Sequence, residues 1–289
     1  MTRLLITGAK GQLGADLVAA GGPDAVGYGS AELDITDAEQ VRRVLGGFAE
    51  DGPGVVINSA AYTAVDKAES EAERADAVNH LGAATVARAA AELGLGLIHV
   101  STDYVFPGDG TRPYRPQDPT GPTSVYGRTK LAGEQAVRAA HPDAQVVRTS
   151  WVYGATGANF VKTMARLEAS RDTLTVVDDQ RGAPTWTVQL AAGLVELAAA
   201  GLPGGVLHAS GGGETTWCGF ARAIFTELGA DPERVRPIST ADYPVPAPRP
   251  AYSVLSGEEW AAAGLTPLPQ WRDALAAAFA AHRSAFVPA

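Results

Sequence analysis

The chain has 289 residues, of which 46% are hydrophobic and 19% charged, so its composition suits a large folded core and argues against intrinsic disorder. A formal net charge of -9 argues against a nucleic-acid partner, because such surfaces need clustered Lys and Arg. Cys218 is the only cysteine, which excludes an internal disulfide and a cysteine-based metal cluster.

The N-terminal segment predicts a first strand over Leu4–Thr7 and a helix over about residues 11–20. Its apolar stretch is too short for a signal peptide and runs directly into a glycine motif. No apolar run approaches the roughly 20 residues that cross a bilayer. We therefore expect a cytoplasmic protein without a membrane partner.

Short apolar strands and long helical stretches alternate through the first half of the chain. Thr36 and Glu39 have the spacing of a capping box, which predicts a helix that ends near Ala49. Residues 66–93 predict one or two helices ended by Gly94. The remaining elements predicted here are strands at residues 25–28, 55–58, 97–101 and 145–148, and a helix at residues 125–140.

After Trp151 the pattern becomes less regular. The elements predicted there are strands at residues 174–177 and 205–210, a helix at 187–200, a proline-rich loop over 231–250 and a short helix at 271–282.

The alternation predicts an α/β fold, with a doubly wound, mainly parallel, Rossmann-like sheet and a smaller, partly interleaved C-terminal substrate domain. We expect residues 1–150 and 186–212 to form the dinucleotide-binding domain. Residues 151–185 and 213–289 would form the substrate-binding domain.

Glycines recur directly after the first strand, where the first helix is expected to begin. Gly8, Gly11 and Gly14 make a GxxGxxG pattern, which differs from the GxGxxG of the usual dinucleotide fingerprint. Glycine lets the chain turn tightly and lets its backbone approach a pyrophosphate, which the helix N-terminus then stabilises. The alternative is a glycine-rich turn without a ligand. The position in the first βα unit favours a cofactor site.

An acidic residue roughly 20 positions further on would bind the adenosine ribose of NAD. The second strand instead ends at Tyr28 and Gly29 with no carboxylate at its tip, and Glu32 comes a little later. Asp34 either hydrogen-bonds adenine or caps a turn, and the residues leave both open. The choice between NADH and NADPH therefore stays open.

Tyr126 and Lys130 are four residues apart on a predicted helix and so share one face. An ammonium beside a phenol stabilises phenolate, so we expect Lys130 to lower the pKa of Tyr126 from about 10. The phenol could then exchange a proton with a substrate oxygen. Thr102 closes the preceding apolar strand, where its hydroxyl can bind a reacting carbonyl. This order of motifs predicts a site for hydride and proton transfer.

These residues resemble the extended short-chain dehydrogenases, and within them the dTDP-4-dehydrorhamnose reductase family. The resemblance covers most of the chain. The matching segments are GAKGQLG (8–14), LDITD (33–37), VINSAAYTAVDKAE (56–69), STDYVF (101–106), VYGRTKLAGE (125–134), RTSWVYG (148–154), NFVKTM (159–164), DQRGAPT (179–185) and, more loosely, RPAYSVLS (249–256).

The resemblance implies that NADPH or NADH reduces the C4 keto group of dTDP-4-dehydro-6-deoxy-L-mannose to give dTDP-L-rhamnose, with the proton coming from Tyr126. The implied catalytic residues are Thr102, Tyr126 and Lys130. The implied cofactor-binding residues are Gly8, Gly11, Gln12, Leu13, Gly14, Asp34, Ile35, Ala61, Tyr62, Thr63, Tyr126 and Lys130. The implied substrate contacts are Thr102, Asp103, Trp151, Asn159 and Arg249.

Some of these contacts have structural alternatives. Asp103 can cap a turn, Trp151 can be a core aromatic, and Arg249 can be a surface residue in a proline-rich loop. Some members of the family bind Mg²⁺ through glutamates at a dimer interface. Here only Asp16 could stand in for one of them, so we expect no metal. A homodimer is a further expectation.

Three rival functions are weighed. A nucleotide-sugar dehydratase or epimerase of the same superfamily would resemble this chain. Dehydratases place Asp-Glu after the active-site Thr, whereas Asp103 and Tyr104 follow Thr102 here, which argues against dehydration and less strongly against epimerisation. A reductase of another dTDP-4-keto-deoxysugar, in an antibiotic or glycan pathway, stays open. So does a non-catalytic NADP-binding regulatory subunit like the β subunit of methionine adenosyltransferase, although the presence of Tyr126 and Lys130 argues against it.

Overall fold

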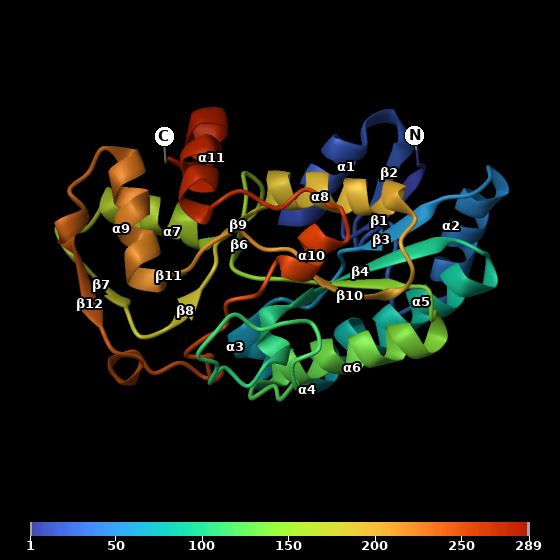
Figure 1. Cartoon of the computed structure of the whole chain (residues 1–289), viewed down its shortest axis with the longest axis horizontal. Coiled ribbons are helices and arrows are strands. Elements are labelled where there is room, and N and C mark those ends of the chain that lie inside the picture. The colour runs from blue at the N-terminus through green and yellow to red at the C-terminus, as the bar shows by residue number, and fades with distance from the viewer. Residues whose placement is uncertain (1, 288–289) are drawn as a thin grey trace.

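The computed structural model describes residues 2–287 and shows a parallel sheet between two helical layers, with a smaller lobe beside it (Figure 1). The strands of the sheet lie in the order β10-β5-β4-β3-β1-β2, and all neighbours are parallel. They are β1 Leu4–Thr7, β2 Ala25–Tyr28, β3 Val55–Asn58, β4 Gly96–Thr102, β5 Gln145–Thr149 and β10 Gly205–His208. This confirms the predicted doubly wound α/β fold.

Two helical layers cover the sheet (Figure 1). One consists of α1 Gln12–Gly21 and α8 Thr187–Ala200, and the other of α2 Ala38–Glu50, α5 Ala83–Glu92 and α6 Val125–Ala140. Successive strand residues point to opposite faces. Leu5 therefore packs with the α2, α5 and α6 layer, whereas Leu4 and Ile6 pack with the α1 and α8 layer.

The segment between β3 and β4 is more broken than predicted. It contains α3 Val65–Ala68, α4 Ala72–Asp76 and the π-helical segment η2 Ala77–Gly82 before α5 begins. The prediction of one or two helices over residues 66–93 was therefore wrong for the first half of that range. Gly94 follows α5 with a φ of 65°, a left-handed conformation that suits the predicted glycine helix end.

The start of α2 is also a correction. Asp37, not Thr36, is its N-cap, because the Asp37 carboxylate accepts the N–H groups of Glu39 and Gln40. Thr36 instead donates its own N–H and hydroxyl to Asp34. A carboxylate can satisfy two free N–H groups of a helix N-terminus at once, and this favours Asp37.

The second lobe, at the left of Figure 1, surrounds a separate aromatic core that includes Tyr153, Trp186, Phe220 and Phe225. Its elements are β6 Val152–Tyr153, α7 Phe160–Glu168, β7 Leu174–Val177, β8 Arg181–Gly182, β9 Thr185–Trp186, β11 Thr215–Thr216, α9 Trp217–Leu228, β12 Val235–Ile238 and α11 Trp271–Phe286. Outside the lobe, α10 Glu258–Ala262 packs near β10. The short 3-10 helices are η1 Gly22–Asp24, η3 Asp103–Val105, η4 Pro232–Arg234 and η5 Thr240–Asp242.

Helices α7 and α9, strand β12 and the two-residue strands β6, β8, β9 and β11 of this lobe were not predicted. Helices α7 and α9 begin at side-chain caps, where Asn159 accepts from the Lys162 N–H and Thr216 from the Gly219 N–H. The expectation that residues 231–250 form only a loop was wrong, because β12 pairs in parallel with β7. Pro237 is tolerated in β12 because this sheet has two strands, so β12 is an edge strand.

Candidate active site

The predicted site residues lie where the carboxyl ends of the parallel strands meet. Gly8 follows β1, Tyr62 comes shortly after β3, Thr102 ends β4 and Trp151 comes shortly after β5. The chain leaves β1 for β2 on one side and places β3 on the other. Ligands of open α/β sheets bind outside the carboxyl ends of the strands at such a switch point.

The glycine loop is packed so closely that a side chain is excluded at Gly8 and at Gly14. A Cβ on Gly8 would lie 2.8 Å from the Ala60 backbone, and one on Gly14 would lie 2.1 Å from the Gly8 carbonyl oxygen. Gly11 is the N-cap of α1 and makes no side-chain cap. The first-turn N–H groups of α1 are thus left for a ligand, and an anionic pyrophosphate fits that position.

The two residues after Gly11 differ in surroundings. Leu13 is buried in the core between the sheet and α8, so only its backbone is suited to contact a cofactor. Gln12 is half-buried, and its side-chain oxygen accepts a hydrogen bond of 3.1 Å from Asn159. This bond joins the glycine loop to the start of α7 in the second lobe.

The carboxylate of Glu32 lies at the tip of β2, although its position in the sequence placed it beyond the strand end. The Glu32 side chain accepts the Gly29 N–H at 2.9 Å and forms an ion pair with Lys10 of the glycine loop. The Lys10 hydrogen bond is the main cause that lowers the pKa of Glu32. The chain turns at Gly29, where its carbonyl oxygen accepts the Glu32 N–H, and this turn carries Glu32 back to the strand end. The expectation of no acid at the tip of β2 was wrong.

Asp34 and Ile35 follow this turn. The Asp34 carboxylate accepts the N–H of Thr36 at 2.9 Å and its hydroxyl at 2.8 Å, so it caps a turn. Ile35 is 4% exposed and packs in the core beside Gly82. Contact with adenine stays a prediction for both residues.

The loop after β3, with Ala61, Tyr62 and Thr63, is joined to α6 by a residue that the sequence analysis missed. Asn79 of η2 accepts the Tyr62 N–H at 2.8 Å and donates to the Tyr62 carbonyl oxygen and to the Thr129 hydroxyl, each at 3.1 Å. Ala61 and Tyr62 are half-buried and Thr63 is exposed. The signal in the sequence was an Asn within an Ala-rich helical segment, and the structure shows that this Asn is fully buried and hydrogen-bonded.

Tyr126 and Lys130 are both buried on α6. Burial raises the pKa of Tyr126 to about 12, against a smaller opposing effect of the Thr102 hydroxyl. Burial lowers the pKa of Lys130 to about 8, against an opposing effect of Glu134. The expectation that Lys130 lowers the pKa of Tyr126 was wrong for this structure, because burial dominates and the Lys130 amine is bound to the Val100 carbonyl oxygen at 2.7 Å.

Thr102 and Asp103 lie at the end of β4. The Thr102 hydroxyl donates to Asp103 Oδ1 at 2.9 Å and accepts the Tyr104 N–H at 3.2 Å. Asp103 is 2% exposed, and burial raises its pKa to about 6. Within residues 2–287, three buried oxygens here have no hydrogen-bond partner, namely Ser101 Oγ, Asp103 Oδ2 and Thr149 Oγ1. Unpaired buried polar atoms at the ends of β4 and β5 fit a site that receives polar groups from a ligand.

Trp151 has an uncommon backbone conformation. Its backbone φ is 44°, a value that residues other than glycine rarely adopt. Its ring stacks on Trp217 with centroids 3.5 Å apart, and a Cβ on Gly182 would meet the same ring at 2.3 Å. Strain of this kind concentrates at ligand sites, so the conformation is compatible with a substrate contact as well as with a core role.

The last two predicted substrate contacts are engaged within the protein. Asn159 caps α7 and donates to the Gly154 carbonyl oxygen at 2.8 Å, besides its bond to Gln12. Arg249 forms an ion pair of 2.8 Å with Asp66 at the start of α3. Arg249 therefore joins the C-terminal segment to the loop after β3, and a diphosphate contact would have to compete with Asp66.

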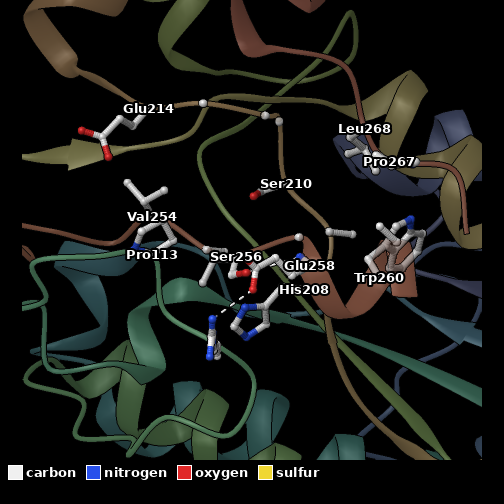
Figure 2. Close-up of a pocket in the computed structure, with 18 of the residues that line it drawn as sticks. Pro113, His208, Ser210, Glu214, Val254, Ser256, Glu258, Trp260, Pro267 and Leu268 are labelled. Carbon is white, nitrogen blue, oxygen red and sulfur yellow. Dashed lines mark hydrogen bonds and ion pairs between the residues drawn. The ribbon is translucent and has the colours of Figure 1, made fainter. Parts of the chain in front are cut away.

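A cavity of about 690 Å³ lies beyond the end of β10, and no predicted site residue lines it. Figure 2 shows Trp260 at one end and Glu214 at the other. Its charged groups are already paired, Glu258 with Arg115 at 3.1 Å and Glu214 with Arg181 at 3.0 Å. The residues that can exchange a proton, Thr102, Tyr126 and Lys130, lie at the strand ends and not in this cavity. We therefore place the candidate site at the strand ends.

No group of three or more His, Cys, Asp or Glu side chains within residues 2–287 is arranged to hold a metal ion. Asp16, considered above, has one buried carboxylate oxygen without a partner among the same residues. None of the helices in this part of the chain combines the length and the apolar character needed to cross a membrane.

Comparison with known proteins gives consistent matches over nearly the whole chain. The model of the RmlD substrate binding domain family matches residues 1–284. A dTDP-4-dehydrorhamnose reductase of Mycobacterium tuberculosis is 54% identical, covering 96% of this chain and 93% of the relative. A probable dTDP-4,6-dihydroxy-2-methyloxan-3-one 4-ketoreductase of Streptomyces antibioticus is 49% identical, covering 96% of this chain and 94% of the relative.

Among solved structures, a dTDP-4-dehydrorhamnose reductase of Bacillus anthracis in complex with NADP superposes with a TM-score of 0.93. It is 38% identical, and the match covers 97% of this chain and all of that chain.

Proposed function

This chain belongs to the RmlD substrate binding domain family, and on that premise we propose that it reduces dTDP-4-dehydrorhamnose to dTDP-L-rhamnose with NADPH or NADH. The observation that carries the proposal is the combination of a glycine loop that excludes side chains at Gly8 and Gly14 with Thr102, Tyr126 and Lys130 at the same end of the sheet. The M. tuberculosis and B. anthracis relatives carry this activity in their names.

The reduced nicotinamide, when bound, supplies the hydride that the C4 carbon of the sugar accepts. Tyr126 donates the proton. Its raised pKa keeps the hydroxyl protonated at neutral pH, so it can donate to the C4 oxygen as negative charge develops there. The Thr102 hydroxyl, which interacts with Tyr126, would donate to the same oxygen and help to stabilise that charge.

Binding the sugar requires Thr102 to exchange one acceptor for another. In the structure its hydroxyl donates to Asp103, so a substrate oxygen must take the place of that carboxylate. Asp103 Oδ2 has no partner within hydrogen-bond distance among residues 2–287, although the Ser253 hydroxyl is near enough to lower the pKa of this carboxyl, and Oδ2 would accept from a sugar hydroxyl. Trp151 would offer its ring face to the apolar face of the sugar.

The cofactor would lie along the strand ends. The backbone of Gly8, Gly11, Gln12, Leu13 and Gly14 would hold the pyrophosphate. Tyr126 and Lys130 would hold the nicotinamide ribose, and the loop of Ala61, Tyr62 and Thr63 would lie along the dinucleotide. Asp34 and Ile35 stay the predicted adenine contacts, and Asn159 and Arg249 the predicted contacts at the nucleotide end of the substrate.

A second candidate is reduction of another dTDP-4-keto sugar. The S. antibioticus relative, at 49% identity, is named for a different keto sugar, which supports this alternative. A regulatory subunit without catalysis is disfavoured, because the Thr102, Tyr126 and Lys130 side chains are all present and buried at one site.

The proposed domain division assigns residues 1–150 and 186–212 to the dinucleotide-binding domain and residues 151–185 and 213–289 to the substrate-binding domain. It is supported by α8 and β10, which rejoin the main sheet after the first part of the second lobe. We also propose a cytoplasmic location and a homodimer. Sedimentation of the purified protein would test the homodimer.

The experiment is to follow the absorbance of NADPH and of NADH with dTDP-4-dehydrorhamnose generated in the reaction mixture, and to identify the sugar product. Rapid oxidation with dTDP-L-rhamnose as product supports the proposal and ranks the cofactors. Cofactor binding without oxidation would contradict it. Oxidation only with another dTDP-4-keto sugar would favour the second candidate.

A further inference from the structure

A line of buried polar side chains crosses the sheet from β1 to α6 and ends at Lys130. The Thr7 hydroxyl donates to Asn58 Oδ1 at 2.6 Å, and Asn58 Nδ2 lies 3.1 Å from His99 Nδ1. His99 Nε2 lies 3.5 Å from Lys130 Nζ. These four residues are at most 2% exposed. Because water does not reach them, the positions of their protons depend on one another.

The orientation of Asn58 decides which nitrogen of His99 carries the proton. Its amide oxygen faces Thr7, so its amide nitrogen, which can only donate, faces His99 Nδ1. Nδ1 must then be an acceptor without a proton. Burial, together with the charge of Lys130, holds the pKa of His99 well below its ordinary value, so the ring is neutral. A neutral ring with a bare Nδ1 carries its proton on Nε2.

The Nε2–H group of His99 therefore points toward the Lys130 amine. An N–H group can donate to the lone pair of an uncharged amine, but it cannot accept from an ammonium. The Val100 carbonyl oxygen is the acceptor that the amine does have, at 2.7 Å. The contact with His99 is thus favourable for the uncharged amine and unfavourable for the ammonium.

We propose that His99 is a positioning residue for the catalytic Lys130, held by Asn58 and Thr7 as the Nε2–H tautomer so that it favours the uncharged form of the amine. This inference rests on the proposed function for its catalytic consequence. The tautomer and the titration of Lys130 do not depend on it. The consequence is a lysine that can exchange its proton near neutral pH while it stays in place on α6.

Other ionisable groups surround this contact. On α6 itself they are Tyr126 and Glu134, and Glu134 favours the charged form of Lys130. The Glu134 carboxylate is bound by Arg148 of β5 at 2.7 Å, which weakens that effect. On the elements packed against α6 they include Asp103 and Tyr104 of η3, and His80 of η2, which is bound to Asp76. His99 of β4 is the one that contacts the amine.

Thr7→Val tests the proposal with a change that does not touch Lys130. Valine keeps the shape of threonine and removes only the hydroxyl that orients Asn58. The amide can then turn its oxygen toward His99, so that the proton moves to Nδ1 and Nε2 becomes an acceptor for the ammonium. We expect the pKa of Lys130 to rise by about one unit. Thr187→Val is the matched control, because Thr187 is a fully buried Thr whose hydroxyl binds the Tyr153 carbonyl oxygen away from this line.

Two measurements on the ligand-free protein give the answer without catalysis. Nitrogen-15 spectra of the ring nitrogens should show His99 protonated at Nε2 in the wild type and at Nδ1 in Thr7→Val. Carbon-13 labelling of lysine should follow the titration of Lys130 directly, since the chain has few lysines, namely Lys10, Lys67, Lys130 and Lys162. The basic limb of kcat/KM for the keto sugar should move upward with the pKa of Lys130.

Asn58→Asp is the second variant if Thr7→Val folds poorly. A carboxylate can only accept, so it requires a proton on His99 Nδ1 and should raise the pKa of Lys130 as well. Protonation of His99 at Nδ1 in the wild type would overturn the proposal. So would a Lys130 titration that is the same in wild type and Thr7→Val although the tautomer has changed. If the predicted shift occurs in a protein that reduces no keto sugar, the proposed function fails and the inference about His99 stands.

Discussion

The two ends of the proposed cofactor site are built in different ways. At the nicotinamide end, Lys130 is 2% and Thr102 is 6% exposed, and their polar atoms bind other buried groups. At the adenine end, Lys10, Glu32 and Asp34 are exposed and pair with each other or with the backbone of a turn. Burial therefore controls protonation at the proposed nicotinamide end, whereas backbone contacts and exposed charge pairs form the proposed adenine end.

The comparison predicts that the largest effect follows from a single atom at the buried end. Tyr126→Phe removes the proton donor and should lower kcat by about 10²–10⁴-fold, with a much smaller fall in NADPH affinity because Lys130 still holds the nicotinamide ribose. Steady-state kinetics and fluorescence titration of NADPH would measure the two separately. Retention of most of the wild-type kcat would show that another group supplies the proton.

Gly14→Ala should act through packing at the glycine loop. The added Cβ would lie 2.1 Å from the Gly8 carbonyl oxygen, so the loop must move away from α1. We expect NADPH affinity to fall at least about tenfold and the free energy of unfolding to fall by about 1–3 kcal/mol. Gly46→Ala in the half-buried part of α2 is the control, because a Cβ there meets nothing within 4 Å. It should leave NADPH affinity nearly unchanged and raise the free energy of unfolding by about 0.5–1 kcal/mol, since alanine favours a helix more than glycine does. Equal behaviour of the two variants would contradict the close packing.

The buried carboxyl of Asp103 should make stability depend on pH. Its pKa in the folded protein is raised to about 6 by burial, whereas the unfolded chain has the ordinary value near 3.8. Between pH about 4 and about 6 the folded state therefore holds a proton on Asp103 that the unfolded state has lost. The free energy of unfolding falls over this range, and the contribution of the proton is lost as pH rises through about 6. Relative to Asp103→Asn, the wild type should lose about 2 kcal/mol between pH about 4 and about 6. Urea unfolding at several pH values would measure this, and a constant difference between the two proteins would refute it.

The smallest effect is expected at the exposed end. Glu32→Gln removes the carboxylate beside Lys10 and leaves that ammonium free for a phosphate at the tip of β2. NADPH affinity should rise relative to NADH by about two- to fivefold, since exposed charge pairs contribute little. Titration of both cofactors would test this, with Glu39→Gln on the exposed side of α2 as a control for the loss of one negative charge. The same ratio in wild type and Glu32→Gln would place the ribose away from Glu32.

Much of the sheet could be predicted because its signals are local. The strand and helix patterns recur along the first half of the chain, and Val125–Ala140 and Thr187–Ala200 are helices over the predicted residues. The second lobe was harder to predict, because α7 has nine residues and β12 is part of a two-stranded sheet. Such elements depend on tertiary packing more than on their own pattern.

The site could be predicted in its residue types but not in its electrostatics. The spacing of Tyr126 and Lys130 indicates a shared helix face, yet it says nothing of burial, which dominates both pKa values. Glu32 was missed because a turn at Gly29 folds it back to the strand end. Asn79 was missed because its two partners, Tyr62 and Thr129, are distant in the sequence. Sequence spacing predicts neighbours along one element, whereas these contacts join different elements.

The most direct test of the account follows the hydride itself. NADPH carrying deuterium on the transferred position of the nicotinamide would be incubated with the protein and dTDP-4-dehydrorhamnose, and the sugar product analysed by nuclear magnetic resonance and mass spectrometry. The account predicts dTDP-L-rhamnose with one deuterium on C4, formed by the wild type and nearly absent with Tyr126→Phe. Deuterium at any other carbon, or bound cofactor with no transfer to the sugar, would contradict it.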